Sequence, residues 1–487
     1  MDSETPLVTF LRNKPMKPRN VRFLVLTSIA SMTTVCLISQ VGAQTTWIGN
    51  TDNDLNKAAN WSAGVPAGSV NSIFTNAGSS GTSLSLTADL QFVGGTAPSS
   101  NGMLFDGAGF TITGNSATRQ LTIGGQGLAI NTTNTITIDA PRVRRNASNT
   151  FEFLGSSGNL VINGDFSTNI TAGTDTLTRV DFSAGSNSTL TFNGNIVNVF
   201  TGAAGAGLGN LTISSAGTGN KVVFNNTSNI GFTGAVSIGN NAQLHLGSGG
   251  TKGTLAGSTS ISLGNSASTF VVNQSDTVTQ GIEFASTITG AGKLEQRGTG
   301  TTILNSTTGY TGATDVVGGK LIINGNTSTS LLTTVKTGAT LGGTGTVGAV
   351  VVDSNGIFAP GDTGIESLNV NGNLTLSSGS ISNFEINTAG DIADLAISSA
   401  LLTFGGTLNV TRIGSALVAG DTFNLFDWSS ATGTFSTVNL PSLDSGLAWD
   451  QSSLYSSGQI SVTVVPEPGA ALLGGLGMLA LLRRRRA

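Results

Sequence analysis

The chain has 487 residues, and almost half of them are Gly, Thr, Ser or Asn, which number 68, 67, 55 and 42. Charged residues make up 10%, far below the average of about 25%, while a hydrophobic fraction of 38% suffices for a core and argues against simple disorder. One histidine, His245, and one cysteine, Cys36, exclude a multi-ligand His/Cys metal centre and a disulfide framework. Any catalytic chemistry would therefore depend on carboxylates.

The N-terminal 43 residues have the pattern of a secretory signal. Five basic residues lie between positions 12 and 22, an apolar stretch covers residues 23–38, and small residues precede Ala43 and Gln44. We expect cleavage between Ala43 and Gln44 after export through the Sec translocon. An uncleaved membrane anchor is the alternative, although the stretch is short for a span. A lipid on Cys36 is disfavoured because Val35 precedes it.

The C-terminal residues 465–487 contain a second targeting pattern. Two prolines end the preceding strand, an apolar run covers residues 469–482, and a basic cluster follows it. Leucines cover all faces of this run, so it reads as a short helix that enters a bilayer with its arginines on the cytoplasmic side. The key residues are Pro466, Glu467, Pro468, Arg483, Arg484, Arg485 and Arg486.

This triplet, apolar segment and arginine cluster closely resemble the PEP-CTERM sorting signal of Gram-negative bacteria. The resemblance covers about the last 23 residues. It implies processing by an exosortase-type enzyme, transient insertion of the C-terminal segment in the inner membrane, and a final location at the cell surface or outside the cell, in organisms that make extracellular polysaccharide. It implies nothing about the activity of the rest of the chain.

The charge of the body argues against nucleic acid as a partner. Without the two ends, 13 basic residues remain against 23 acidic ones, whereas nucleic-acid binding needs clustered cations. One cluster exists, formed by Arg142, Arg144 and Arg145 after Pro141. We interpret it as a solvated surface turn; the alternatives are that it holds an anionic glycan or pairs with local carboxylates.

Residues 84–410 repeat short β-prone segments bracketed by Gly, Asn, Ser or Thr. Leu190-Thr191-Phe192 and Leu374-Thr375-Leu376 are examples in which apolar residues alternate with Thr. Strands this short cannot bury a core as isolated hairpins, but stacked coils can. The pattern therefore predicts an all-β chain folded as a right-handed parallel β-helix, or β-solenoid, with Asn and Gly at its corners.

One longer repeat is clear at residues 288–325, and a weaker copy covers residues 205–246. The pattern resembles the autotransporter-associated β-strand repeat, with a Gly-x-Gly-x-Leu opening, a Gly-x-Gly strand, a Tyr-Thr-Gly-x-Thr centre and a Gly-x-Leu strand. Too few residues follow position 410 for the translocator barrel of an autotransporter. The matching residues are Gly290, Gly292, Leu294, Gly298, Gly300, Tyr310, Thr311, Gly312, Thr314, Gly319 and Leu321.

Small β caps are expected at both ends of the solenoid. Residues 44–83 contain Trp47 and Trp61, which resemble the paired-tryptophan opening of such proteins, and residues 411–464 hold many of the remaining aromatic residues. The predicted order is therefore a signal peptide (1–43), an N-terminal cap (44–83), a solenoid (84–410), a C-terminal cap (411–464) and a sorting segment (465–487).

The candidate sites in the body are weak. Residues 50–56 open like a calcium loop, but Lys57 and Ala63 replace its required Gly and Glu, which favours a surface loop. His245, in a Leu-His-Leu strand, is expected to face out of the core without a partner for acid–base work. Two acidic groups are present, although no spacing in the sequence stacks them: Asp362 with Glu366, and Glu385 with Asp391 and Asp394.

Two functional hypotheses follow. The first is an exported, non-enzymatic surface or matrix protein, without cofactor or metal, whose polar faces contact extracellular polysaccharide or take part in adhesion. The alternative is a polysaccharide lyase or hydrolase on the same scaffold, which would need Asp, Glu, Lys or Arg clustered on one face of adjacent coils.

Overall fold

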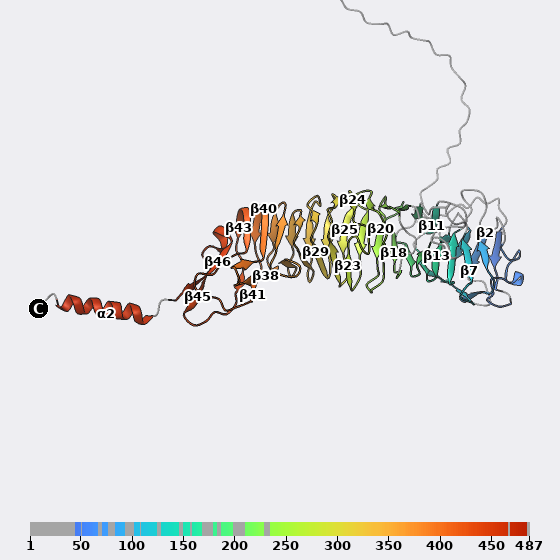
Figure 1. Cartoon of the computed structure of the whole chain (residues 1–487). Coiled ribbons are helices and arrows are strands. Elements are labelled where there is room, and N and C mark those ends of the chain that lie inside the picture. The colour runs from blue at the N-terminus through green and yellow to red at the C-terminus, as the bar shows by residue number, and fades with distance from the viewer. Residues whose placement is uncertain are drawn as a thin grey trace, which may run out of the picture. The chain divides into compact units, whose positions relative to one another are not determined.

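A computed structural model describes residues 44–49, 51–66, 71–75, 83–92, 102–107, 109–123, 128–145, 150–155, 158–167, 179–182, 187–197, 210–227, 234–465 and 468–484. Gln44 and the residues that follow it form a parallel β-solenoid, in which each coil adds one strand to each of several long sheets (Figure 1). The predicted all-β solenoid is therefore confirmed.

Sheet I contains eleven parallel strands in the described residues. Its first strands, β1 and β2, pair in parallel. The strands are β1 (Gln44–Trp47), β2 (Asn71–Thr75), β5 (Met103–Asp106), β8 (Leu128–Ile130), β11 (Thr150–Gly155), β14 (Arg179–Phe182), β17 (Leu211–Ser215), β19 (Val236–Ile238), β21 (Ile261–Leu263), β24 (Ile288–Gly290) and β27 (Gly309–Tyr310).

Sheet II follows sheet I around each coil and continues to the end of the solenoid. Its strands include β3 (Ser83–Leu86), β6 (Thr111–Gly114), β9 (Thr135–Asp139), β12 (Asn159–Ile162), β15 (Thr189–Phe192), β18 (Lys221–Phe224), β20 (Gln243–Leu246), β22 (Thr269–Val272), β25 (Lys293–Gln296), β28 (Thr314–Val316), β31 (Thr333–Val335), β34 (Val350–Val352), β37 (Leu374–Leu376), β40 (Leu395–Phe404) and β43 (Phe426–Gly433). A parallel branch joins it at β40, formed by β30 (Asn326–Thr327), β33 (Thr346–Val347) and β36 (Ser367–Val370).

The third side of the coils is divided between two sheets. Sheet III contains β4 (Leu90–Phe92), β7 (Gln120–Ile123), β10 (Arg142–Arg145), β13 (Asp165–Ser167) and β16 (Ile196–Val197). Sheet IV contains β23 (Thr277–Thr279), β26 (Thr301–Leu304), β29 (Lys320–Ile323), β32 (Thr340–Gly343), β35 (Ile357–Pro360), β38 (Ile381–Asn387), β41 (Thr407–Ile413) and β44 (Thr437–Asn439), with β39 (Ile392–Ala393) antiparallel to β38.

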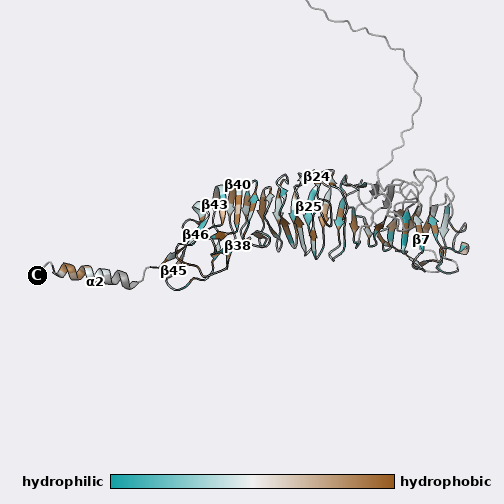
Figure 2. Cartoon of the chain, viewed as in Figure 1, coloured by the Kyte–Doolittle hydropathy of each residue, from teal (hydrophilic) through white to brown (hydrophobic). Residues whose placement is uncertain are grey.

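The alternation of apolar and polar residues explains why these segments form strands. Leu160, Leu190, Val222 and Leu244 stand in register on neighbouring strands of sheet II, and each is fully buried. Within each strand, the residues that alternate with the buried ones face outward. Figure 2 shows the resulting mixture of hydrophilic (teal) and hydrophobic (brown) residues across the strands. The interior is thus a stack of aliphatic and aromatic side chains.

The length of a coil changes along the chain. Leu160 pairs with Leu190 and Leu190 with Val222, so these coils take 30 and 32 residues. Thr314 pairs with Thr333 and Thr333 with Val350, so these take 19 and 17 residues. The strands keep similar lengths, and the connections between them account for the difference.

The sheets continue through both regions that were expected to be caps. Trp47 lies on β1 with a fully buried side chain, and its ring meets Trp61 edge to face at 5.3 Å. At the other end, β41, β43 and β44 extend the sheets past residue 410. The remaining elements are an antiparallel sheet of β42 (Thr422–Asn424), β46 (Gln459–Val464) and β45 (Leu447–Asp450), and helices η1 (Ala58–Asn60), α1 (Leu454–Ser457) and α2 (Pro468–Arg484).

Candidate functional site

A cleft of about 590 Å³, lined by polar and apolar groups alike, lies on the outer face of sheet IV. Strands β29, β35, β38 and β41 supply parts of its wall, and residues 361–364 and Asp394 complete it. We call it the carboxylate cleft. Its lining residues are Lys320, Ala359, Pro360, Gly361, Asp362, Thr363, Gly364, Asn383, Phe384, Glu385, Asp394, Asn409 and Thr411.

The β38–β39 hairpin forms one side of the cleft. Asn387 pairs with Ile392 across the hairpin, and positive φ angles of 93° at Gly390 and 52° at Asp391 make its turn. Along β38, Phe384 is buried while Asn383 and Glu385 are only half-buried. This alternation places Asn383 and Glu385 on the cleft side of the strand.

Asp394 holds the two sides of the cleft together. Its Oδ1 accepts a hydrogen bond from the backbone N–H of Glu366 at 3.0 Å, and its Oδ2 accepts one from the N–H of Glu385 at 2.8 Å. The residue is only 3% exposed. Burial raises the pKa of Asp394 to about 6, and the charges of Glu385 and Glu366 add to this effect, while the two N–H donors oppose it.

Other polar groups of the cleft are bonded to each other. Asn324 Nδ2 donates to Asp362 Oδ2 at 3.1 Å, and the Asp362 N–H donates to Glu366 Oε2 at 2.8 Å. Asn409 Nδ2 donates to Asn383 Oδ1 at 3.0 Å. These bonds fix the loop of residues 361–366 and the strand β38 around the cleft.

Two opposite charges of the cleft have no such partner within the described residues: the Lys320 ammonium and the Glu385 carboxylate take part in no hydrogen bond or ion pair there. The cleft therefore offers a cationic donor and an anionic acceptor to a ligand. Within the described residues, no group of three His, Cys, Asp or Glu side chains is placed to hold a metal ion.

The structure corrects the sequence analysis of the acidic residues. Asp362, Glu366, Glu385 and Asp394 come together, although no spacing in the sequence suggested it. The reason is the hairpin and the loop of residues 361–366, which fold toward each other around Asp394. Asp391 does not join them, because it is exposed at the hairpin turn.

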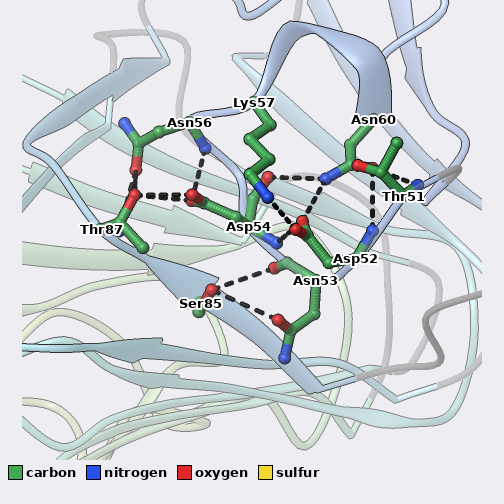
Figure 3. A network of polar contacts seen from close by, with 9 residues as sticks. All are labelled: Thr51, Asp52, Asn53, Asp54, Asn56, Lys57, Asn60, Ser85 and Thr87. Atoms are coloured by element: carbon green, nitrogen blue, oxygen red, sulfur yellow. Dashed lines mark hydrogen bonds and ion pairs between the residues drawn. The ribbon is translucent and has the colours of Figure 1, made fainter.

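The calcium-like loop is held by internal hydrogen bonds (Figure 3). Asp52 accepts bonds from Lys57 Nζ, from the Asp54 N–H and from Asn60 Nδ2, and these contacts, in that order, lower the pKa of Asp52 to about 2. The Asp54 carboxylate accepts bonds from the hydroxyl of Thr87 at 2.7 and 2.8 Å. The protein's own donors therefore engage the carboxylates that a calcium ion would need.

The clear repeat corresponds to two successive coils. Gly290 and Leu294 lie on β24 and β25 of the first coil, and Tyr310, Thr314 and Leu321 lie on β27, β28 and β29 of the second. Thr311 and Gly312 connect β27 to β28, and Gly319 precedes β29. The backbone of each coil leaves no room for a side chain at the glycines of the next coil. A Cβ on Gly312 would lie 2.0 Å from the Gly292 oxygen, and a Cβ on Gly319 would lie 2.2 Å from the Gly300 oxygen. A Cβ on Gly298 would likewise lie 2.0 Å from the Gln274 oxygen.

Tyr310 explains the centre of the repeat. Its fully buried hydroxyl lies 2.6 Å from Thr314 Oγ1, which lies 2.9 Å from Ser330 Oγ in the next coil. Burial raises the pKa of Tyr310 to about 12. The Tyr-Thr-Gly-x-Thr segment therefore supplies a buried hydroxyl chain that links coils.

The arginine cluster is a strand and not a turn, so that prediction was wrong. Arg142, Arg144 and Arg145 lie on β10, which pairs in parallel with β7 and β13. Val143 between them is fully buried. Its inward position provides the alternation that makes this segment a strand.

His245 differs in part from expectation. It alternates with the core residues Leu244 and Leu246, which places it on the outer side of β20, yet it is only 4% exposed. Its Nε2 lies 3.0 Å from Gln243 Oε1, so it has a partner. Burial first, and then the charges of Lys221 and Arg297, lower the pKa of His245 to about 3.

Much of the targeting pattern lies outside the described residues, namely Ala43, Pro466, Glu467, Arg485 and Arg486 with the whole predicted signal. Gln44 begins β1. In this segment, residues Pro468–Arg484 form the helix α2, which includes Arg483 and Arg484. Within the described residues, no helix is both long enough and apolar enough for a membrane crossing.

Comparison with known proteins gives one informative similarity. The chain is 36% identical over 211 residues to the adhesin BmaC autotransporter of Brucella suis biovar 1 (strain 1330). The match covers 41% of this chain and 6% of that adhesin, so the chain spans a small part of the relative's length. No protein-family model matches the chain.

Proposed function

We propose that this protein is an exported, non-enzymatic surface protein that acts in adhesion. The observation that carries the proposal is the combination of a parallel β-solenoid with 36% identity to an autotransporter adhesin over 211 residues. Because the match covers 6% of that adhesin, the similarity supports adhesion through the fold rather than a particular receptor.

The outer faces of the solenoid suit many weak polar contacts. Asn193 Nδ2 donates to Asn163 Oδ1 at 2.8 Å, and Asn225 Nδ2 donates to Asn193 Oδ1 at 3.0 Å. A second ladder runs from Asn439 through Asn409 to Asn383. Stacked amides present regularly spaced donors and acceptors, which match the hydroxyl groups of a polysaccharide.

Delivery is the second part of the proposal. The chain would cross the inner membrane through the Sec translocon, and an exosortase-type enzyme would process it at Pro466, Glu467 and Pro468 before its release to the surface or matrix. The sequence pattern of residues 465–487 supports this route.

Cell attachment tests the adhesive function. A strain lacking the gene, the same strain with the gene restored, and a strain producing the chain without residues 44–465 would be compared for attachment to polysaccharide-coated surfaces. We expect restored attachment only with the full chain. Equal attachment of all three strains would refute an adhesive role.

A polysaccharide hydrolase or lyase is the second candidate, and the carboxylate cleft favours it. Asp362 and Glu385 line one cleft together with Lys320, and a pair of carboxylates is what glycoside hydrolysis uses. Asp394 is poorly suited as the acid, because backbone N–H groups engage both of its oxygens. Release of reducing or unsaturated ends from a polysaccharide panel, abolished by Glu385→Gln, would establish the enzyme and displace the adhesin.

A further inference from the structure

We propose that the carboxylate cleft is a binding subsite for uncharged, hydroxyl-rich glycan units and discriminates against uronate or sulfated chains. This inference rests on the proposed adhesive function and gives it a ligand class. It concerns the cleft between the loop of residues 361–366 and the β38–β39 hairpin, to which neither the repeat pattern nor the similarity to the adhesin assigns a role.

The charge of the cleft disfavours anionic ligands. The carboxylates of Asp362, Glu385 and Asp394 line the cleft, and Glu366 bonds to its loop, whereas Lys320 is the one cation among the lining residues. A glycan carrying carboxylates or sulfates would meet this negative surface and lose affinity through like-charge repulsion. A neutral glycan has no such cost.

The free groups match sugar hydroxyls. The bonds described above engage both Asp394 oxygens and one oxygen each of Asp362 and Glu366. Glu385 therefore remains as an acceptor and Lys320 as a donor. A hydroxyl both donates and accepts, so hydroxyls on different sugar units of one glycan can satisfy these two groups.

The dimensions and the surroundings of the cleft suit one part of a longer glycan. A volume of about 590 Å³ lies within the range of small-molecule sites, roughly 300–1,000 Å³. The floor contains Asn383 and Asn409, which belong to the ladder that continues to Asn439 on the next coil. A glycan seated beside Glu385 can therefore extend along the ladder.

Binding of oligosaccharides to the purified solenoid tests the inference. Isothermal titration would use neutral oligomers of glucose, galactose and mannose and an oligogalacturonate of equal length. We expect at least one neutral oligomer to bind and the oligogalacturonate to bind more weakly. Failure of every neutral oligomer to bind, or tighter binding of the oligogalacturonate, would overturn the proposal.

Variants then locate the binding. Glu385→Ala and Lys320→Ala should each weaken neutral binding about tenfold, corresponding to the loss of one well-made polar contact. Glu385→Lys should narrow the difference between neutral and anionic oligomers. Glu295→Gln, on the outer face of β25, is the control and should bind as the native protein does. Unchanged affinity in both alanine variants, with native circular dichroism, would place binding elsewhere.

The same variants separate this inference from the proposed function. If cells with the native protein attach and cells with Glu385→Ala attach equally well, the cleft is not the adhesive subsite and adhesion stands. If cells with the native protein do not attach better than the deletion strain, the adhesive function itself fails.

Discussion

Asp394 Oδ2 accepts a hydrogen bond from the backbone N–H of Glu385 at 2.8 Å and so ties the end of one hairpin strand to the other. The same carboxylate binds the N–H of Glu366 through its other oxygen. One buried side chain thereby joins the hairpin to the loop of residues 361–366, and the cleft depends on it.

The stability of the protein should depend on pH through the protonation of Asp394. Its pKa is raised from 3.8 to about 6, so the folded state binds the proton more readily than the unfolded state. Its contribution to stability is therefore greatest below about pH 4 and is lost as the pH rises through about 6. Thermal unfolding of Asp394→Asn between pH 4 and pH 7 should lack this decline, while Asp391→Asn, at the exposed turn, should keep it. An identical pH profile for Asp394→Asn and the native protein would contradict this role.

His245 should make the stability depend on pH in the opposite direction. Its pKa falls from 6.5 to about 3, so the unfolded chain takes up a proton that the buried ring does not. The stability that this group contributes is complete above about pH 6.5 and is lost as the pH falls toward 3. The charged groups that act on it are Lys221 and Arg297. His245→Gln should flatten the loss below pH 6.5 in chemical denaturation experiments, and an unaltered loss would show that the ring titrates normally.

The hydroxyl of Tyr310 should contribute measurably to stability. Tyr310→Phe removes the bond to Thr314 but leaves Thr314 paired with Ser330, so we expect a loss of about 1 kcal/mol. Thr314→Val removes the Thr314 partner of the buried Tyr310 hydroxyl, while Ser330 Oγ keeps its bond to the Gly312 oxygen, and should cost more, about 1–3 kcal/mol. Tyr455→Phe is the matched control, since Tyr455 is 36% exposed and accepts a longer bond of 3.2 Å from the Phe435 N–H. Equal free energies of unfolding for all three variants would show that the hydroxyl chain does not contribute to stability.

The asparagine ladder should tolerate a neutral truncation better than a charge. Asn193→Asp would turn a carboxylate oxygen toward Asn163 Oδ1 where an amide now donates. We expect a loss of about 1–2 kcal/mol at neutral pH, larger than that of Asn193→Ala and reduced in acid. Denaturant titrations at pH 7 and pH 3 measure this, and a smaller loss for Asp than for Ala at pH 7 would contradict the donor direction.

The sequence predicted the strands well where apolar and polar residues alternate without charge. Leu190-Thr191-Phe192 lies within β15, and Leu374-Thr375-Leu376 forms β37. The prediction of a turn at Arg142 was wrong, because the three arginines drew attention away from Val143, whose side chain faces the core. A reading of residues 142–144 as polar–apolar–polar could have found this strand.

The carboxylate cleft could not be predicted in the same way. Asp362 and Glu385 are 23 positions apart, and a strand period says nothing about loops that leave the coil. Their meeting depends on the hairpin turn at Gly390 and Asp391 and on the bonds to Asp394. Lys320 lies on β29, two strands before β35 in sheet IV. It lines the same cleft only because the coils stack.

The sorting proposal makes a separate prediction. Mass spectrometry of the native protein should find a C-terminus near Pro466, and Glu467→Ala should leave the arginine cluster attached. An intact C-terminus in the native protein would contradict processing at this segment without affecting the solenoid.

Surface exposure on intact cells tests the central claim most directly. The chain has one cysteine, Cys36, within the predicted signal, so Ser415→Cys in a Cys36→Ser background offers a single thiol at an exposed position of the solenoid. A membrane-impermeant maleimide should label this variant on intact cells as completely as after lysis. Labelling that occurs only after lysis would contradict a surface protein.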